Sequence, residues 1–349
     1  MVQFYPLKVS EITPLTPNSV DISFQIPEAL RETFEFESGQ YITVKLPVGD
    51  SEIRRAYSIS SKPGGNTITI GVKKVPGGTF SVYANDTLKE GDVLEVMPPQ
   101  GRFVFESAGP ARHIMAFAAG SGITPIMSII QTALESNSEN HVVLVYGNQS
   151  KGEAMYYDAL QALSNQYNDR FKVYYTFSRA QEEDCMFGRI EKSTVNFIAR
   201  NKHKSLNVEN YYLCGPFEMI EAVTNALTEN GVPKDQIHHE LFTEPEGESQ
   251  SSPEADGMTH LEVTLDDTVH SVEMDRSSIV LDALIKAKLD APYSCQGGVC
   301  STCIARVTEG KATMVKNQIL TDSELEEGLI LTCQAHAETA ILKIDYDDV

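Results

Sequence analysis

The sequence predicts a multidomain protein with three parts: a small antiparallel β-barrel, a parallel sheet with helical crossovers, and a small mixed α+β sheet that carries a cysteine loop. Short alternating apolar runs, separated by turns rich in proline and glycine, fill residues 1–107. Strands and helices then alternate through residues 108–243, and four of the six cysteines gather in residues 258–349. A chain of 349 residues is long enough for two or three separate cores.

The composition is that of a soluble globular protein, with 41% apolar and 22% charged residues. The most apolar run, residues 114–130, is interrupted by two glycines and Pro125, so it fits a strand, a turn and a helix better than a membrane span. The N-terminus has no basic region followed by an apolar core. We therefore expect no signal peptide, no membrane partner and a cytoplasmic location.

The formal net charge of −21 has the wrong sign for a nucleic-acid partner. Acidic residues outnumber basic ones clearly in residues 258–349. An acidic domain suits docking on a basic face of another protein, because such fields raise association rates. Solubility alone is an equally good explanation of the same charge.

The first domain, residues 1–107, is expected to be a barrel because its apolar residues alternate over short runs. The expected strands cover residues 20–26, 41–46, 67–72 and 93–97, and turns fall at residues 47–49, 63–65, 76–78 and 98–101.

Two clusters in this barrel have the chemistry of a dinucleotide site. Arg55, Tyr57 and Ser58 offer a phosphate clamp, a stacking ring and a hydroxyl for a ring nitrogen. Gly78 and the glycine before it precede Ser81, so that backbone N–H groups there can reach a diphosphate. Each cluster alone is equally typical of a charged strand edge or an ordinary turn. Together, in a chain that also carries a redox-type cysteine loop, they indicate a flavin dinucleotide.

The second domain, residues 108–243, is expected to be a parallel sheet whose ligands bind at the carboxyl ends of its strands. Expected strands are residues 113–119, 142–146, 173–177 and 211–214, and expected helices are residues 125–135, 152–165 and 217–230.

A glycine turn, Gly120-Ser-Gly122, follows the first of these strands and indicates a pyrophosphate site at a helix N-terminus. Thr124 is expected to cap that helix and Pro125 to take its first position. The third glycine of the Rossmann fingerprint is missing, so this signal is weak by itself. Cys214, Gly215 and Pro216 end a later strand in the corresponding place, although an inert buried thiol is an ordinary alternative for Cys214.

Ser178 and Arg179 end the third strand, where a hydroxyl and a guanidinium suit the 2′-phosphate that distinguishes NADP from NAD. Solvation of a surface pair is the alternative, and Arg189 is a weaker candidate for the same charge. Phe242 stands at the end of the domain, where it either covers a flavin ring or packs in the core. Residues 244–257 are rich in proline, serine and acid and are expected to be a linker.

The third domain, residues 258–349, is expected to place a helix against a small mixed sheet. Its strands are expected at residues 261–265, 270–274, 304–307 and 340–344, and its helix at residues 279–288.

Cys295, Cys300, Cys303 and Cys333 in this domain have the spacing of plant-type 2Fe–2S ferredoxins. A structural zinc site is the alternative, but such sites usually pair cysteines in two Cys-x2-Cys units and only one is present. Two glycines inside the loop favour a cluster, because the backbone must approach it closely.

This order of motifs resembles the ferredoxin–NADP reductase superfamily over essentially the whole chain, and more narrowly the reductase subunits of phenylacetyl-CoA epoxidase complexes. The resemblance implies a Greek-key FAD barrel, a Rossmann-like NAD(P) domain and a β-grasp ferredoxin domain. It implies that residues matching the family's FAD contacts are Arg55, Ala56, Tyr57, Ser58, Val72, Lys74, Gly78, Thr79, Phe80, Ser81 and Phe242. It implies that residues matching the nucleotide pocket are Gly120, Gly122, Thr124, Ser178, Arg179, Cys214, Gly215 and Pro216.

The function that the resemblance implies is electron transfer from NADPH, or NADH, through FAD and a 2Fe–2S cluster to the oxygenase component of a multicomponent complex. A flavin must stand between a two-electron donor and a one-electron cluster, and hydride transfer is expected beside Ser58 and Cys214. The reductase of a steroid, alkane or ring-hydroxylating oxygenase is the alternative within enzymes. A zinc-stapled module that senses nucleotide is the alternative in another class.

Overall fold

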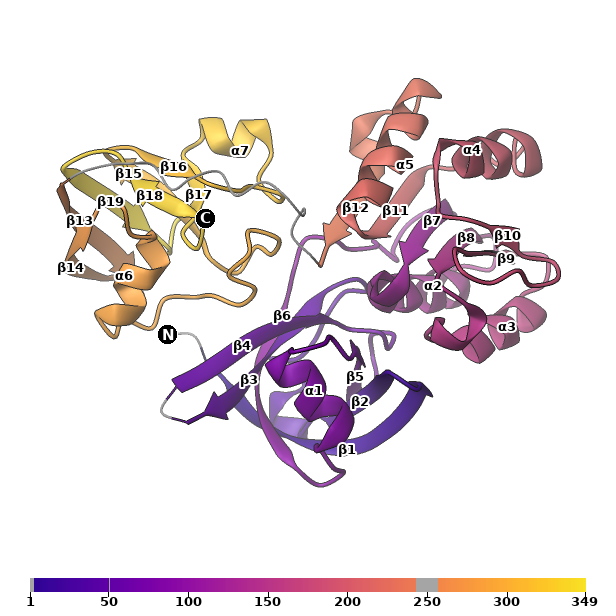
Figure 1. Ribbon diagram of the computed structural model, residues 1–349, viewed down its shortest axis with the longest axis horizontal. Helices are drawn as coiled ribbons and strands as arrows, with labels where there is room; N and C mark the ends of the chain where they lie inside the picture. The colour runs from indigo at the N-terminus through magenta and orange to yellow at the C-terminus, as the bar shows by residue number, and fades with distance from the viewer. Residues whose placement is uncertain (1–2, 50, 243–256) are drawn as a thin grey trace. The chain divides into compact units, whose positions relative to one another are not determined.

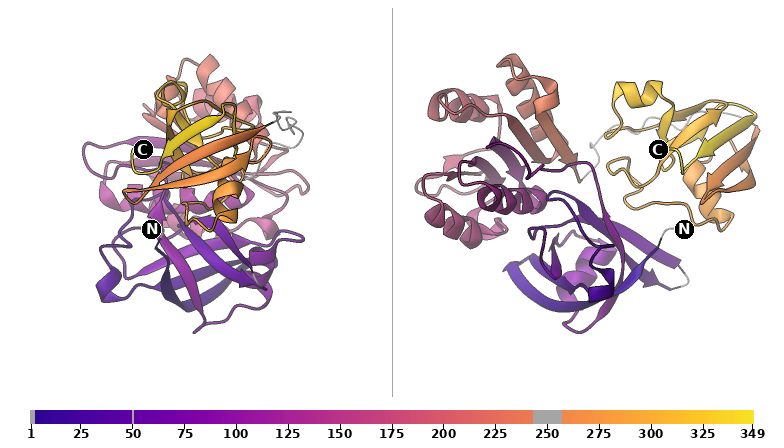
Figure 2. Two further views of the ribbon diagram at one scale, coloured as in Figure 1. Left: turned by 90° about the vertical axis from the view of Figure 1, so that its left-hand side faces the viewer. Right: turned by 180° about the vertical axis from the view of Figure 1, so that it is seen from behind.

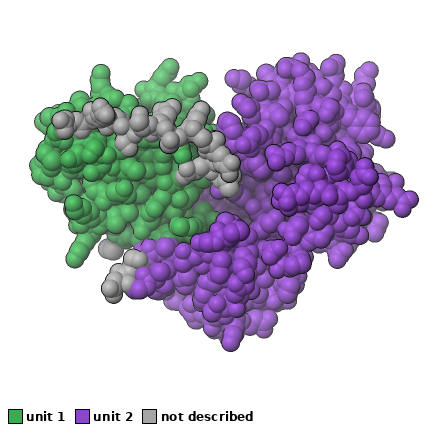
Figure 3. Space-filling view, in the orientation of Figure 1, with its two compact units in different colours: residues 1–4, 54–56, 244–349 green, residues 5–53, 57–243 purple. Residues whose placement is uncertain are grey.

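The computed structural model describes residues 3–49, 51–242 and 257–349 (Figure 1). Contacts divide the chain into two compact units (Figure 3). Over their described residues, one comprises residues 5–53 and 57–243, and the other comprises residues 1–4, 54–56 and 244–349. The expected linker, residues 244–257, lies outside the described residues except for Gly257.

The N-terminal part is a six-stranded antiparallel sheet with the order β4-β3-β6-β1-β2-β5. Its strands are β1 (Tyr5–Thr16), β2 (Ser19–Gln25), β3 (Tyr41–Val48), β4 (Ser51–Ser58), β5 (Thr67–Lys73) and β6 (Val93–Gln100). Ile59, which follows β4, pairs with Ile70 of β5, so the two edge strands meet and the sheet closes. Alternating side chains such as Ile22 and Phe24 fill the interior. The predicted antiparallel barrel is confirmed.

A helix that the sequence did not predict, α1 (Thr79–Asp86), lies between β5 and β6. A short 3-10 turn, η1 (Glu28–Leu30), lies between β2 and β3.

The second part of this unit is a sheet flanked by helices (Figure 2). The sheet is parallel, with the strand order β10-β9-β8-β7-β11-β12. Its strands are β7 (His113–Ala119), β8 (His141–Asn148), β9 (Phe171–Phe177), β10 (Met186–Phe187), β11 (Asn210–Gly215) and β12 (Ile237–Leu241). The chain winds one way from β7 to β10 and the other way from β11, so the switch point lies between β7 and β11. The predicted Rossmann-like sheet is confirmed.

Helices and turns connect these strands: η2 (Gly120–Gly122), α2 (Ile123–Ser136), η3 (Lys151–Glu153), α3 (Tyr157–Gln166), α4 (Lys192–Val195), η4 (Asn196–Lys202), α5 (Phe217–Glu229) and η5 (Lys234–Gln236). The expected cap of α2 is wrong. The helix follows the glycine turn directly, so the chain is already helical at Thr124, and the Thr124 hydroxyl donates backward to the Ser121 carbonyl at 3.0 Å. Pro125 consequently takes the third helical position, not the first.

The C-terminal unit contains a five-stranded mixed sheet with the order β14-β13-β19-β15-β17. Its elements are β13 (Met258–Leu265), β14 (Thr268–Asp275), α6 (Val280–Lys286), β15 (Ile304–Glu309), β16 (Ala312–Met314), α7 (Asp322–Glu326), β17 (Leu329–Leu331), β18 (Ala335–Ala337) and β19 (Ile341–Asp345). β13 pairs parallel with β19 and antiparallel with β14, and β16 and β18 form a separate two-stranded antiparallel sheet. Leu281 and Leu284 of α6 are buried in the core of this unit. This is the predicted α+β ferredoxin-type fold.

None of the helices in the described part of the chain has the length and apolar character needed to cross a bilayer.

A partly buried hydrogen bond joins the barrel to the nucleotide sheet within the larger unit. The hydroxyl of Tyr156, just before α3, donates to the Asp21 carboxylate of β2 at 2.5 Å. Tyr156 has a left-handed backbone, with φ of 59°, which is costly for a large side chain. The strand beside Asp21 has a glycine at Gly71, where a Cβ would lie 2.4 Å from the Tyr156 hydroxyl and 2.7 Å from the Thr124 methyl. The Tyr156–Asp21 hydrogen bond therefore requires a residue without a side chain at position 71.

This joint predicts a pH-dependent stability. Burial raises the pKa of Asp21 from 3.8 to about 7, with Glu11 adding to the rise and the Tyr156 hydrogen bond opposing it. The folded state therefore keeps a proton that the unfolded state loses between pH 4 and 7. The free energy of unfolding should fall as pH rises through that window, and this group should add no further change above it.

The full shift corresponds to about 4 kcal/mol. Because the side chain is only partly buried, we expect roughly half of this. Denaturant unfolding at pH 5 and pH 8 should show that Asp21→Asn removes this loss, whereas the exposed control Asp169→Asn retains it. The same pH dependence in wild type and Asp21→Asn would contradict the assignment.

Candidate functional site

Strand β4 brings the first predicted cluster next to the second. Tyr57 lies half-buried on β4, and its ring packs on Phe80 of α1 with 5.3 Å between centroids. Ser58, the last residue of the strand, is 4% exposed, whereas Arg55 is exposed. The guanidinium of Arg55 donates to the Arg54 carbonyl at 2.8 Å. β4 thus presents a ring, a buried hydroxyl and an exposed cation, as an extended flavin dinucleotide requires.

The second cluster forms the N-terminus of α1. Gly77 has φ of +74°, and Gly78 takes the cap position without a side-chain hydrogen bond to the first turn. A Cβ at Gly78 would lie 2.5 Å from Ser81 Oγ, which already accepts from the Val75 N–H at 3.1 Å. The N–H groups of Thr79 and Phe80 begin the helix and suit a diphosphate.

Two other residues predicted for the flavin have their side chains engaged elsewhere. Val72 is fully buried in the barrel core. The Lys74 ammonium binds the Asp86 carboxylate at 2.7 Å. Any contact of Val72 with the cofactor therefore comes from its backbone, and Lys74 must leave its partner or contribute through its backbone as well.

The nucleotide turn lies against the end of β11 at the switch point. A Cβ at Gly122 would lie 2.1 Å from the carbonyl oxygen of Cys214, and one at Gly215 would lie 2.8 Å from the Met219 side chain. Gly120 has φ of +56°, and its carbonyl accepts from the Tyr146 hydroxyl at 2.9 Å. The ends of β7 and β11 therefore form a single surface, which side chains at Gly122 and Gly215 would block.

Sequence reasoning missed Glu240, which links the flavin strand to this surface. Glu240 lies on β12, is 8% exposed, and accepts from the Ser58 hydroxyl at 3.0 Å. It is also the register partner of Cys214 on β11. Burial, and secondarily Glu240, raises the pKa of the Cys214 thiol well above its ordinary value, so the thiol stays neutral. A glutamate in a strand gives no sequence signal of its own. Ser58, by contrast, is marked in the sequence by Arg55 and Tyr57 just before it.

Phe242 follows two residues after Glu240 and is 36% exposed. An aromatic ring with that exposure at the end of β12 is available to cover a ligand.

Ser178 and Arg179 lie beside the end of β8. Their N–H groups donate to the carbonyls of Asn148 and Gln149, each at 2.9 Å. Arg179 and Arg189 are both exposed, and the Gly188 N–H bond to the Phe177 carbonyl at 2.9 Å brings their segments together. The predicted pair and its weaker alternative thus lie at one edge of the sheet.

Asn148 is a second residue that sequence reasoning missed. Its side-chain amide is buried, and neither of its polar atoms has a hydrogen-bond partner within the described residues, although the Tyr146 hydroxyl is close. It stands at the carboxyl end of β8, next to Ser178. An unsatisfied buried amide at a ligand-binding edge suits a hydrogen-bonding ligand.

The cysteine loop wraps tightly around its four thiols. Gln296 and Gly298 have positive φ values of 57° and 72°, and Gln334 holds the loop through a 2.9 Å bond to the Gln296 carbonyl. The Gly297 N–H donates to Cys295 Sγ at 3.3 Å. The remaining three cysteines, Cys300, Cys303 and Cys333, are buried.

The electrostatics of this loop fit a metal-loaded state. The neighbouring Cys295 thiol, together with burial, raises the pKa of Cys300 well above its ordinary value. Four crowded thiols ionise together only when cations compensate their charge, which two irons provide. No three His, Cys, Asp or Glu side chains in the described residues surround a single ion. A 2Fe–2S cluster has four cysteines divided between two irons, so the loop fits it without such a group.

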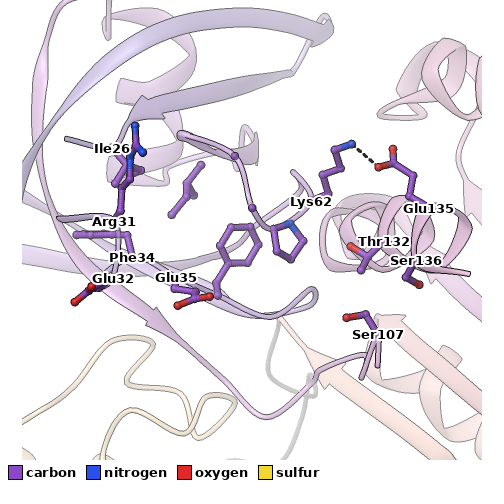
Figure 4. Close-up of a pocket in the computed structure, with 15 residues that line it drawn as sticks. Ile26, Arg31, Glu32, Phe34, Glu35, Lys62, Ser107, Thr132, Glu135 and Ser136 are labelled. Atoms are coloured by element: carbon purple, nitrogen blue, oxygen red, sulfur yellow. Dashed lines mark hydrogen bonds and ion pairs between the residues drawn. The ribbon is translucent and has the colours of Figure 1, made fainter. Parts of the chain in front are cut away.

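A cavity of about 610 Å³ lies away from these positions, at the C-terminal end of α2 (Figure 4). Phe34 and Ile68 of the barrel form part of its wall, and Lys62 pairs with Glu135 at its edge. None of its lining residues is a predicted site residue.

The contact at Gly122 yields a test of the nucleotide turn. Gly122→Ala should slow flavin reduction by NAD(P)H about 100-fold, because its Cβ would displace the β11 backbone and shift the bound nucleotide. Gly152→Ala is the matched control, since a Cβ there meets nothing within 4 Å. Anaerobic stopped-flow measures both rates, and the flavin spectrum shows whether each variant folds. A Gly122→Ala protein with the wild-type rate would place the nucleotide elsewhere.

Family models match all three parts of the chain. An oxidoreductase FAD-binding domain matches residues 6–105, an oxidoreductase NAD-binding domain matches residues 117–225, and a 2Fe-2S iron-sulfur cluster binding domain matches residues 263–338. The last match identifies the cysteine loop's domain as an iron–sulfur domain, so the zinc-stapled alternative is wrong.

Two relatives match almost their whole lengths. A 1,2-phenylacetyl-CoA epoxidase component from Escherichia coli (strain K12) is 33% identical, over 99% of each chain. The ferredoxin reductase component of 3-ketosteroid-9-alpha-monooxygenase from Rhodococcus rhodochrous is 32% identical, over 97% of this chain and 96% of that protein.

The solved structure of phthalate dioxygenase reductase shares the fold, with a TM-score of 0.62, 23% identity and 98% coverage of both chains. With three domain matches and a full-length relative at 33% identity, the chain belongs to the ferredoxin–NADP reductase superfamily, as an FAD- and NAD-dependent oxidoreductase with a C-terminal 2Fe–2S domain.

Proposed function

We propose that this protein is the reductase of a phenylacetyl-CoA epoxidase system in phenylacetate catabolism, which passes electrons from NADPH through FAD and a 2Fe–2S cluster to the oxygenase component. The observation that carries the electron route is the meeting of Ser58, Glu240 and Cys214 at the switch point. The choice of oxygenase rests on the relative at 33% identity. We also propose cytoplasmic location and the domain limits 1–107, 108–243 and 258–349.

The proposed roles follow the geometry. The N-terminus of α1 holds the FAD diphosphate, and Tyr57 packs against the ring system. Arg55 supplies a phosphate-binding cation from β4. Gly120, Gly122 and Gly215 leave room for the nucleotide over the β7 and β11 ends. Cys295, Cys300, Cys303 and Cys333 hold the cluster.

Bound FAD supplies the conversion of a hydride into the single electrons that an iron–sulfur cluster accepts. The chain's own contribution is to orient and to exclude water. The buried Ser58 hydroxyl donates its hydrogen to Glu240, so its oxygen is left to accept a hydrogen bond. Cys214, the register partner of Glu240, keeps a neutral thiol. A neutral thiol adds no charge next to a departing hydride, and Phe242 is placed to shield the same region until nucleotide arrives.

A 3-ketosteroid monooxygenase is the second candidate partner system, because the relative from Rhodococcus rhodochrous is 32% identical over a similar length.

The proposal predicts coupled activity with its own oxygenase. Purified protein should show flavin bands on an iron–sulfur background that NADPH bleaches under anaerobic conditions. Addition of a phenylacetyl-CoA oxygenase should then give NADPH-dependent epoxidation, measured by mass spectrometry of the CoA ester, at least tenfold faster than with a 3-ketosteroid oxygenase. Preference for the steroid system would move the protein to the second candidate. Iron-free protein after reconstitution would overturn the electron route.

The arginine at the end of β9 predicts cofactor choice. Arg179→Ala should lower kcat/KM for NADPH about 10- to 100-fold and leave NADH within about threefold, because a charge-assisted bond to the 2′-phosphate is worth about 1.5–3 kcal/mol. Arg200→Ala, which removes a cation bound to Asn230, is the matched control. Equal loss with both nucleotides would show that Arg179 does not read the 2′-phosphate.

A further inference from the structure

A chain of buried groups connects the end of the last strand to the cysteine loop. Tyr346 follows β19, is 7% exposed, and its hydroxyl donates to Thr332 Oγ1 at 2.7 Å. The Thr332 hydroxyl in turn donates to the carbonyl oxygen of Cys303 at 3.0 Å, and Thr332 is fully buried. All members of this chain belong to the C-terminal unit.

Thr332 holds the Cys303 carbonyl twice. Its backbone N–H donates to the same oxygen at 3.1 Å. Thr332 directly precedes Cys333, whose thiol is a neighbour of the Cys303 thiol. The two hydrogen bonds therefore fix the separation of two cysteines that lie thirty positions apart in the chain.

The carbonyl oxygen of Cys303 carries a partial negative charge close to the proposed cluster. Reduction adds a further negative charge there, so donors that neutralise the carbonyl favour the reduced state. A hydroxyl that itself accepts a hydrogen bond is a stronger donor, and Tyr346 polarises Thr332 in this way.

We propose that Tyr346 is a positioning residue for the 2Fe–2S cluster, which acts through Thr332 to hold Cys303 beside Cys333 and to raise the reduction potential of the cluster. The inference rests on the proposed function, since it assumes that these cysteines bind the cluster. It adds a residue outside the cysteine loop to the groups that set the reduction potential of the cluster.

Packing alone would also explain a buried tyrosine at this position. The Tyr346 N–H donates to the Thr264 carbonyl at 3.1 Å, so the residue helps to hold the sheet whatever its hydroxyl does. Tyr346→Phe keeps the ring and this backbone bond, and removes the hydroxyl alone. A change in potential in that variant cannot come from lost packing.

The test measures the midpoint potential of the full chain by anaerobic titration, with the EPR signal of the reduced cluster as readout. Tyr346→Phe should lower the equilibrium constant for reduction about fivefold, which is about 40 mV more negative at 59 mV per factor of ten. Thr332→Val should shift it at least as far, because it removes the hydroxyl that contacts the carbonyl and leaves Tyr346 without its acceptor. Thr332→Ser keeps the hydroxyl and should stay near wild type.

Tyr212→Phe is the matched control, because it also removes a buried tyrosine hydroxyl, bound to the Val104 carbonyl at 3.2 Å, from the other unit. Wild-type midpoint potentials in both Tyr346→Phe and Thr332→Val would overturn the inference. The EPR signal of the cluster in these variants would still support the proposed function. A wild-type protein without a 2Fe–2S signal would overturn both. If Tyr346→Phe loses its cluster, the two Thr332 variants decide. Different midpoint potentials in Thr332→Val and Thr332→Ser support the proposed hydrogen-bond chain, and equal potentials refute it.

Discussion

The hydrogen bond from Ser58 to Glu240 is the constraint that holds the barrel and the parallel sheet of the larger unit together. It joins the last residue of a barrel strand to a strand of the parallel sheet, although the two residues are 182 positions apart. Both side chains are nearly inaccessible to water, so water does not readily replace a partner that is removed, and loss of either side chain is costly. Because Glu240 is also the register partner of Cys214, one bond fixes the flavin strand against the nucleotide surface.

The same junction has a second, independent support at β2. Tyr156 accepts a left-handed backbone in order to reach Asp21, and Gly71 gives it room. A hydride donor and its acceptor must lie within roughly 3.5 Å of each other. A single contact between barrel and sheet would still allow rotation about it and would not hold this distance. Two hydrogen bonds, one at β4 and one at β2, restrict rotation between barrel and sheet far more than either alone. The tight contact of Gly122 with Cys214 adds a third close approach, between the turn after β7 and the end of β11.

The features that sequence predicts correctly are those with a local signature. Alternation over residues 20–26 marks a barrel strand, the run 113–119 marks β7 to the residue, and the cysteine spacing marks the iron–sulfur domain. The features it misses arise only when distant segments meet. Glu240, Asn148 and Asp21 are ordinary polar residues in strands, and burial beside a particular partner gives them their properties. The expected cap at Thr124 is wrong because a cap depends on where the preceding turn becomes helical, which Gly120–Gly122 decides.

The two compact units assign the parallel nucleotide sheet and the iron–sulfur domain to different parts of the chain. The FAD-binding and NAD-binding family models match residues 6–105 and 117–225, most of which lie in the larger unit. The cluster belongs to the other unit, where Tyr346 and Thr332 tie its loop to the sheet. A single electron passes to a partner without a bond being made or broken, so docking requires surface complementarity and a suitable potential, and the substrate of the oxygenase leaves no mark on the reductase.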